Sequence, residues 1–142
     1  MRSFVICCML LLSVTVSANP FTATLVAPNE PGVRLNVHGY VMDAAGRPLA
    51  GARVKAHHAD ARGLYHLPGM REPRLRATVL TDARGRFELH TIRPGSYPGT
   101  NEAGHIHFEV AADGYETQWP VLEFENGTRA NDATIRIRLK KP

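Results

Sequence analysis

Hydrophobic and polar residues alternate along most of the chain in short runs. The alternation is clearest near the C-terminus, where Ile135, Ile137 and Leu139 are separated by Arg136 and Arg138. Side chains two positions apart lie on the same face of a strand, so this run predicts a strand with one buried and one solvated face. Runs that predict strands lie at residues 35–41, 52–56, 77–80, 85–92, 106–110 and 135–139.

Turn-forming residues separate these runs. Residues 43–48 and 82–85 combine Asp with Gly or Pro, which is the chemistry of tight turns. No stretch after residue 18 carries apolar residues at helical spacing over three turns. The pattern predicts an antiparallel all-β domain with few or no helices. Residues 19–31 are expected to form an irregular lead-in, and residues 94–104 a loop between two strands.

The first 18 residues have the layout of a signal peptide. Arg2 precedes an apolar run at residues 4–16, and the small residues Ser17 and Ala18 follow. The run is shorter than the roughly 20 apolar residues that span a bilayer, so we expect cleavage after Ala18 and no stable membrane span. Residues 19–142 then form a single domain, which we expect to be secreted or periplasmic.

Cysteine content and charge limit which side chains could bind a metal ion and which partners are expected. Cys7 and Cys8 both lie in the predicted signal peptide, so the mature chain would have neither a disulfide framework nor a cysteine metal site. Any metal would be bound by histidine, tyrosine or carboxylate side chains. The formal net charge is +4, but basic and acidic residues are interspersed. Because nucleic-acid binding needs a clustered basic surface, we expect no nucleic-acid partner.

The most distinctive local feature is a His-x-His pair at His105 and His107. Ile106, Phe108 and Val110 form the apolar face of the same predicted strand. The two imidazoles therefore project together from the opposite face, where both can bind one metal ion. Such a pair alone is more often part of a solvated surface, so a metal site requires further donors.

Two tyrosines upstream could supply these donors. Tyr97 lies a few residues before the histidines, in the predicted loop, and Tyr65 ends the segment that follows the second predicted strand. Each tyrosine alone is better explained by a packed ring with its hydroxyl at the surface.

Four motifs, taken in their order along the chain, resemble the intradiol ring-cleavage dioxygenases, the family of the catechol and protocatechuate enzymes. They are Ala-Asp-x-x-Gly-x-Tyr at 59–65, Thr-Asp-x-x-Gly-x-Phe at 81–87, Thr-Ile-x-Pro-x-x-Tyr at 91–97 and His-Ile-His-Phe at 105–108. Four ordered motifs are much harder to obtain by chance than one. The resemblance covers roughly residues 35–124 and implies the antiparallel β-sandwich of the intradiol dioxygenase core.

The resemblance also implies a function. It implies a non-haem Fe(III) ion bound by Tyr65, Tyr97, His105 and His107, and Fe(III) does favour anionic oxygen donors and accepts imidazole. By position, Tyr97 matches the tyrosine that the family releases when substrate binds, and Tyr65 matches the one that stays, so both are candidate catalytic residues. The implied substrates are a small catechol-like aromatic diol and O2, with cleavage between the hydroxylated carbons. Whether the protein forms a homo-oligomer is left open.

Three positions depart from the family pattern. Glu102 stands where family enzymes usually have an arginine, and His57 stands where they often have a tryptophan. A glutamine usual after the histidines is replaced within residues 121–124. A carboxylate at 102 would repel an electron-rich catecholate. The cations that could replace the arginine are Arg71, Arg74, Arg76 and Arg93.

Two alternatives to the enzyme are kept, and Glu102 favours the first of them. One is a non-catalytic, transthyretin-like β-sandwich that binds a metal or an aromatic ligand. The other is a purely structural interaction domain, which would have no affinity for iron. His57, His58 and His66 could form a second metal site, but we expect them to be surface histidines.

Overall fold

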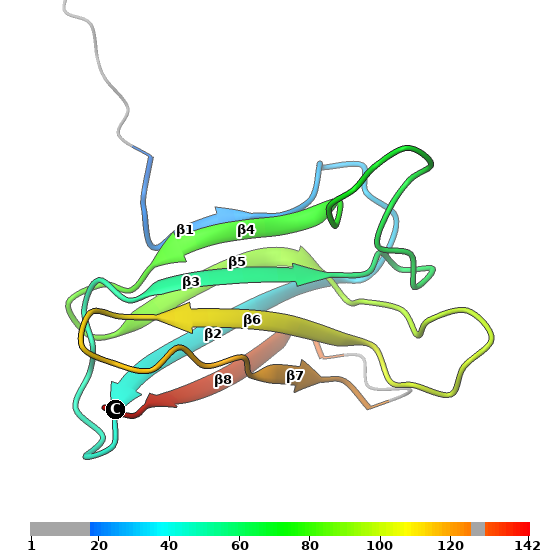
Figure 1. Cartoon of the computed structure of the whole chain (residues 1–142). Helices are drawn as coiled ribbons and strands as arrows, with labels where there is room; N and C mark the ends of the chain where they lie inside the picture. Colours follow the sequence, from blue (N-terminus) through cyan, green and yellow to red (C-terminus); the bar gives the residue numbers. More distant parts are fainter. Residues whose placement is uncertain (1–17, 126–129) are drawn as a thin grey trace, which may run out of the picture.

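A computed structural model describes residues 18–125 and 130–142 as a β-sandwich of two four-stranded sheets (Figure 1). The strand order is β1-β5-β2-β8 in the first sheet and β4-β3-β6-β7 in the second. The strands are β1 (Thr22–Thr24), β2 (Arg34–Asp43), β3 (Arg53–His58), β4 (Leu75–Leu80), β5 (Arg86–Ile92), β6 (His105–Ala111), β7 (Val121–Glu123) and β8 (Asp132–Leu139). No helix occurs within the described residues. The expected all-β sandwich is confirmed.

The core lies between the two sheets and follows from the alternation in sequence. Val37 and Leu89 of the first sheet, and Val54 of the second, are fully buried. Burial of one such side chain stabilises the fold by about 1.5–3 kcal/mol. Phe87 fills the space above Gly39, where a Cβ atom would overlap the phenyl ring. The apolar positions therefore set the spacing of the sheets as well as their stability.

The first sheet is mixed rather than purely antiparallel. β1 runs parallel to β5, and β8 runs parallel to β2 from the pair Asn36↔Asp132 to the pair Asp43↔Leu139. All pairs in the second sheet are antiparallel. The antiparallel arrangement expected from the sequence therefore describes the sheet that holds the histidine pair, but not the whole of the first sheet.

The strands predicted from sequence are present, with bounds that differ by a few residues. Two further strands, β1 and β7, were not predicted, and β1 lies within the expected irregular lead-in. Both have three residues, which is too short for an alternating pattern to be recognised. Residues 94–104 form the expected loop between β5 and β6. The predicted signal peptide falls on residues 1–17, outside the described part, and on Ala18.

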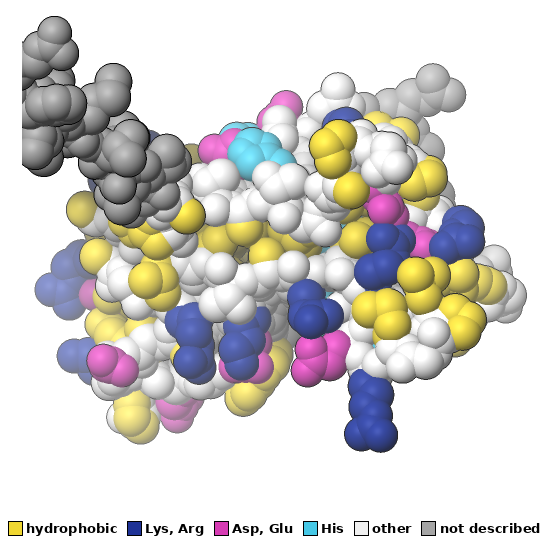
Figure 2. All heavy atoms as spheres, turned by 90° about the horizontal axis from the view of Figure 1, so that it is seen from above, with side chains coloured by type: hydrophobic (Ala, Val, Ile, Leu, Met, Phe, Trp, Pro, Cys, Tyr) yellow, Lys and Arg dark blue, Asp and Glu magenta, His cyan; other side chains and the backbone are white. Residues whose placement is uncertain are grey.

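No helix long and apolar enough to cross a membrane is found among the described residues. The face in Figure 2 carries Lys and Arg side chains among Asp and Glu side chains. Hydrophobic side chains are visible at several places on this face, including the end of the sandwich where the β3–β4 and β5–β6 loops lie. Among the exposed apolar residues are Leu64, Leu67 and Met70 of the β3–β4 loop and Tyr97 of the β5–β6 loop.

The outer face of the second sheet carries the histidine pair. Residues that are paired across antiparallel strands lie on the same face of the sheet. Arg76 pairs with His57, His57 pairs with His107, and His107 pairs with Val121. These four residues form one row across β4, β3, β6 and β7, with the candidate ligand His107 in the row.

Candidate metal centre

Three of the four predicted ligands lie together at the start of β6. The Nε2 atoms of His105 and His107 are 3.0 Å apart. The hydroxyl oxygen of Tyr65 lies 3.4 Å from each of these nitrogens. The histidines come from β6, as the alternation predicted, and the tyrosine comes from the loop that follows β3. The structure thus places one oxygen and two nitrogen donors around a common point.

The two imidazoles are held by different contacts. His105 Nδ1 lies 2.8 Å from the carbonyl oxygen of Ala103, to which it donates a hydrogen bond, and this leaves the Nε2 lone pair directed at the site. The ring of His107 stacks on the ring of His57, with centroids 4.9 Å apart and planes at 18°. These contacts orient both rings independently of a metal ion, as partners of ligating histidines commonly do.

The spacing of the donors fits a bound transition-metal ion. With bonds of about 2.1 Å, typical of metal–imidazole bonds, donors at angles of about 90° to 110° lie about 3.0 to 3.4 Å apart. The distances between the donors of Tyr65, His105 and His107 match this range. Within residues 18–125 and 130–142, no group of three or more His, Cys, Asp or Glu side chains forms a metal site. Tyrosine therefore has to complete the donor set.

Tyr97 lines the same pocket but is placed differently. Its side chain is 54% exposed, and among the described residues its hydroxyl forms no hydrogen bond to the other three candidates. The pocket has a volume of about 410 Å³. The structure therefore brings Tyr65, His105 and His107 into contact and leaves Tyr97 at the pocket wall.

Asp60 holds the turn that ends at Tyr65. Its carboxylate accepts the backbone N–H of Leu64 at 3.1 Å, and its backbone carbonyl accepts the N–H groups of Gly63 and Gly95, each at 2.9 Å. The bond from Gly95 joins this turn to the β5–β6 loop. Asp60 belongs to the motif at residues 59–65, but the sequence alone did not show that it holds this turn.

Glycines allow the loops around the pocket to touch backbone to backbone. A Cβ atom at Gly63 would overlap the carbonyl oxygen of Ser96, and one at Gly104 would overlap the carbonyl oxygen of Pro94. Gly63 also has φ of +82°, a conformation that other residues rarely adopt. The segment with Tyr65, the segment with Tyr97 and the approach to the histidines are therefore packed as one unit.

The electrostatics of the metal-free pocket favour uncharged side chains. Burial raises the pKa of Tyr65, and the negative charge of Glu102 raises it further. Burial lowers the pKa of His107, and the neighbouring His105 lowers it too, against a smaller opposite effect of Glu102. Burial and the two histidines likewise lower the pKa of His57. Neutral imidazoles are ready to bind a cation, whereas Tyr65 needs a nearby cation to become a tyrosinate.

The arginines proposed to replace the missing family arginine lie in different places. Arg74 pairs with Glu30 at 2.6 Å. Arg93 donates a hydrogen bond of 2.6 Å to a backbone carbonyl. Arg71 is exposed. Arg76 lies in the row of His57 and lines a pocket next to the metal centre.

The three extra histidines do not share one environment. His58 is fully buried, so the expectation of a surface histidine was wrong for this residue. Its ring points into the core because it alternates with His57 along β3. His57 is partly buried and lines the metal-centre pocket, and the exposed His66 lines it too. The expected surface position thus describes His66 alone.

Comparisons with known proteins place this arrangement in a family. The protein family described as "Dioxygenase" matches residues 15–137, which is most of the chain. The chain belongs to this dioxygenase family. The family resemblance seen in the sequence is confirmed, because the relatives of this chain are catechol-type and protocatechuate-type intradiol enzymes.

Individual relatives support the same assignment. The chain is 35% identical over 105 residues to the protocatechuate 3,4-dioxygenase beta chain of Burkholderia cepacia, covering 65% of this chain and 45% of that protein. It is 31% identical over 130 residues to chlorocatechol 1,2-dioxygenase of Rhodococcus opacus, covering 78% of this chain and 50% of that protein. The chain thus spans about half or less of the length of the curated relatives that it matches.

A solved structure of similar extent also matches. It is the dioxygenase domain of a dioxygenase carbohydrate-binding protein fusion from Streptomyces sp. SirexAA-E, with a TM-score of 0.70 and 28% identity. The match covers 88% of this chain and 93% of that one. The sandwich of this chain is therefore similar to that dioxygenase domain over 88% of its length.

Proposed function

We propose that the protein is an exported non-haem Fe(III) dioxygenase that cleaves a catechol-like aromatic diol between its hydroxylated carbons. The observation that carries the proposal is the set of three donors formed by Tyr65, His105 and His107 within a dioxygenase fold. In this proposal Tyr97, at the wall of the same pocket, is the fourth ligand. Export is supported by the signal-peptide layout of residues 1–18.

The proposed reaction divides the work between the metal ion and the chain. Ferric iron supplies the redox chemistry by which a catecholate ring reacts with O2. His105 and His107 bind the ion as neutral ligands, in the orientations described above. Tyr65 binds it as a tyrosinate, because a nearby cation opposes the effects that raise the pKa of this phenol.

Tyr97 is suited to a second task. Its exposed side chain can move away from the pocket wall. If Tyr97 binds as a tyrosinate, its phenolate oxygen can take a proton from the diol as the diol binds. The net reaction adds both atoms of O2 to the diol, breaks the bond between the hydroxylated carbons and yields a dicarboxylic acid. The protons of the two hydroxyl groups are recovered in the product.

Glu102 favours a second candidate function. Its carboxylate lines the pocket and disfavours the charged form of Tyr65. A negative charge at this position also opposes the approach of a catecholate. A module that binds a metal ion or an aromatic ligand without catalysis is the alternative that this residue supports.

The first test is a visible absorption spectrum with iron quantification on aerobically purified protein, followed by O2 uptake after catechol is added. Tyrosinate-to-iron charge transfer should colour the protein, catechol should shift the band, and turnover should consume O2. Tyr65→Phe and His107→Ala should each lower turnover by at least about a hundredfold. Tyr115→Phe, which removes a hydroxyl but keeps the ring that lies against Lys141, serves as the control.

Each outcome decides between the candidates. A coloured protein that binds catechol but consumes no O2 would support the binding module. A protein that stays colourless after reconstitution with iron would contradict the dioxygenase and an iron-binding module, and would leave a module that binds only an aromatic ligand. Full turnover by His107→Ala would contradict the assignment of the ligands.

A further inference from the structure

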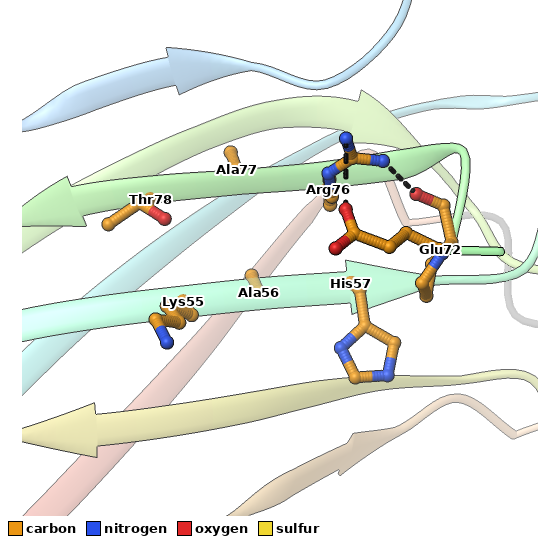
Figure 3. A pocket seen from close by; sticks show the side chains of 8 residues that line it. Lys55, Ala56, His57, Glu72, Arg76, Ala77 and Thr78 are labelled. Carbon is orange, nitrogen blue, oxygen red and sulfur yellow. Dashed lines mark hydrogen bonds and ion pairs between the residues drawn. The ribbon is translucent and has the colours of Figure 1, made fainter.

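A second pocket of about 670 Å³ opens on the outer face of β3 and β4 (Figure 3). Figure 3 shows Lys55 and His57 projecting from β3, with Arg76 in contact with Glu72 at the start of β4. Among the residues that line the pocket are Lys55, His57, Glu72, Pro73, Arg76 and Thr78. The pocket is the larger of the two and carries two cations.

This pocket adjoins the metal centre. His57 and Pro73 line both pockets, so the two pockets lie side by side and share these residues; the two pockets together are called the groove. Arg76 pairs with His57, and His57 pairs with His107, which places Arg76 two strand spacings from the candidate ligand. At about 4.8 Å per spacing, the Cα atoms of Arg76 and His107 are about 10 Å apart. A substituent of a few atoms on a metal-bound ring spans this distance, because the arginine side chain closes part of it.

The cations of the groove form weak ion pairs with carboxylates. Arg76 lies 3.2 Å from the Glu72 carboxylate, and Lys55 lies 3.4 Å from the Glu109 carboxylate. Arg76 also donates a hydrogen bond of 2.7 Å to the carbonyl oxygen of Pro73, through a different guanidinium nitrogen from the one nearest Glu72. The side chains of Arg76 and Glu72 are 51% and 70% exposed. Ion pairs this exposed are worth about 0 to 1 kcal/mol. A ligand carboxylate can therefore replace Glu72 on Arg76 at little cost.

We propose that this groove is a subsite for a negatively charged substituent, so that the preferred substrate is an aromatic diol with a short side chain ending in a carboxylate. The inference rests on the proposed function of the metal centre. The diol ring occupies the metal-centre pocket, and the side chain passes His57 and Pro73. The carboxylate accepts hydrogen bonds from the guanidinium of Arg76, with Lys55 of the same groove close by. Planar guanidinium groups bind carboxylates in this bidentate manner.

The test compares two substrates that differ only in charge, 3-(3,4-dihydroxyphenyl)propionate and its primary amide. The quantity measured is the ratio of kcat/KM for the acid to kcat/KM for the amide, with the iron-loaded protein. The wild type should favour the acid. Arg76→Gln should lower the ratio about fivefold, the size expected for a partly exposed ion pair. Glu72→Gln should raise it, because it removes the carboxylate that competes for Arg76.

Arg86→Gln is the matched control, since Arg86 forms a similar (i,i+4) ion pair with Asp82 on the other sheet. It should leave the ratio unchanged. An equal ratio in the wild type and Arg76→Gln, or a preference of the wild type for the amide, would overturn the inference. If neither compound is turned over, the proposed function fails. Dissociation constants of the acid and the amide, from calorimetry on the same variants, then test the subsite alone.

Discussion

Glu102 brings a negative charge to the pocket of the candidate centre. It lines the pocket with Tyr65 and adds to the effect of burial in raising the pKa of that phenol. Burial is the larger cause and does not depend on Glu102. The Glu102 carboxylate therefore makes the smaller contribution to the raised pKa of Tyr65.

We predict that Glu102→Gln lowers the pKa of Tyr65 in the metal-free protein. The substitution removes a negative charge near the developing phenolate, while the burial that also raises this pKa remains. The measurement is a titration followed by the ultraviolet absorbance of phenolate, with Tyr65→Phe used to identify the transition. Glu116→Gln, which changes an exposed carboxylate, is the control. An unchanged Tyr65 transition would show that the charge of Glu102 does not reach the phenol.

At the residue scale, the sequence predicted the histidine pair from strand alternation alone, and both side chains do project together. The contact of Tyr65 with that pair was reached only through the family motifs, because 40 positions separate it from His105. The burial of His58 was missed because two adjacent histidines on a strand do not show which of them faces inward. The place of Arg76 beside His57 depends on strand register, which no local pattern contains.

Two loops at one end of the sandwich form the pocket and are locked to each other. Gly63 of one loop lies against the carbonyl of Ser96 in the other, at a φ of +82°. Gly46 has the same φ in a turn with open space around it. A comparison of alanine substitutions at Gly46 and Gly63 therefore distinguishes the loss of stability from backbone strain from the loss caused by the clash between the loops.

We predict that Gly63→Ala destabilises the protein by about 2 kcal/mol more than Gly46→Ala. A methyl group at 46 meets only the strain of the left-handed conformation, about 1–2 kcal/mol. A methyl group at 63 must in addition push the two loops apart. Denaturant unfolding of the metal-free protein gives both values. Equal losses of stability would indicate that the loops separate without cost.

Strands with a long alternating pattern were predicted well, and the three-residue strands were not. β2, β5, β6 and β8 follow the sequence pattern closely. β1 and β7 have three residues each and are set by pairing with β5 and β6. The parallel direction of β8 beside β2 also depends on partners distant in sequence, and alternation looks the same in both directions.

Stability of the whole molecule depends on a polar contact between the sheets. His58 of β3 lies 2.7 Å from the hydroxyl of Thr91 of β5, and its other ring nitrogen donates to the carbonyl of Ala59 at 2.6 Å. Burial is the main reason why the pKa of His58 falls to about 4 from its usual 6.5. The folded protein therefore keeps this ring neutral where an unfolded chain would protonate it.

We predict that the metal-free protein loses stability as the pH falls from about 6.5 to about 4. In this window the unfolded chain binds a proton at His58 that the folded protein does not, a difference of about 3 kcal/mol over the full window. His58→Gln, which stays neutral, should show a pH dependence weaker by up to that amount in denaturant unfolding. His66→Gln, which removes an exposed histidine, is the control. Identical pH dependence in wild type and His58→Gln would contradict this role.

The parallel pairing of β8 with β2 has a consequence for how the chain folds. β2 lies between β5 and β8, so the first sheet is complete only when residues 132–139 are in place. About a hundred residues separate the paired strands, and contacts between such distant segments slow folding. Synthesis from the N-terminus delivers β2 before β8, so the first sheet can close only after residues 132–139 have left the ribosome.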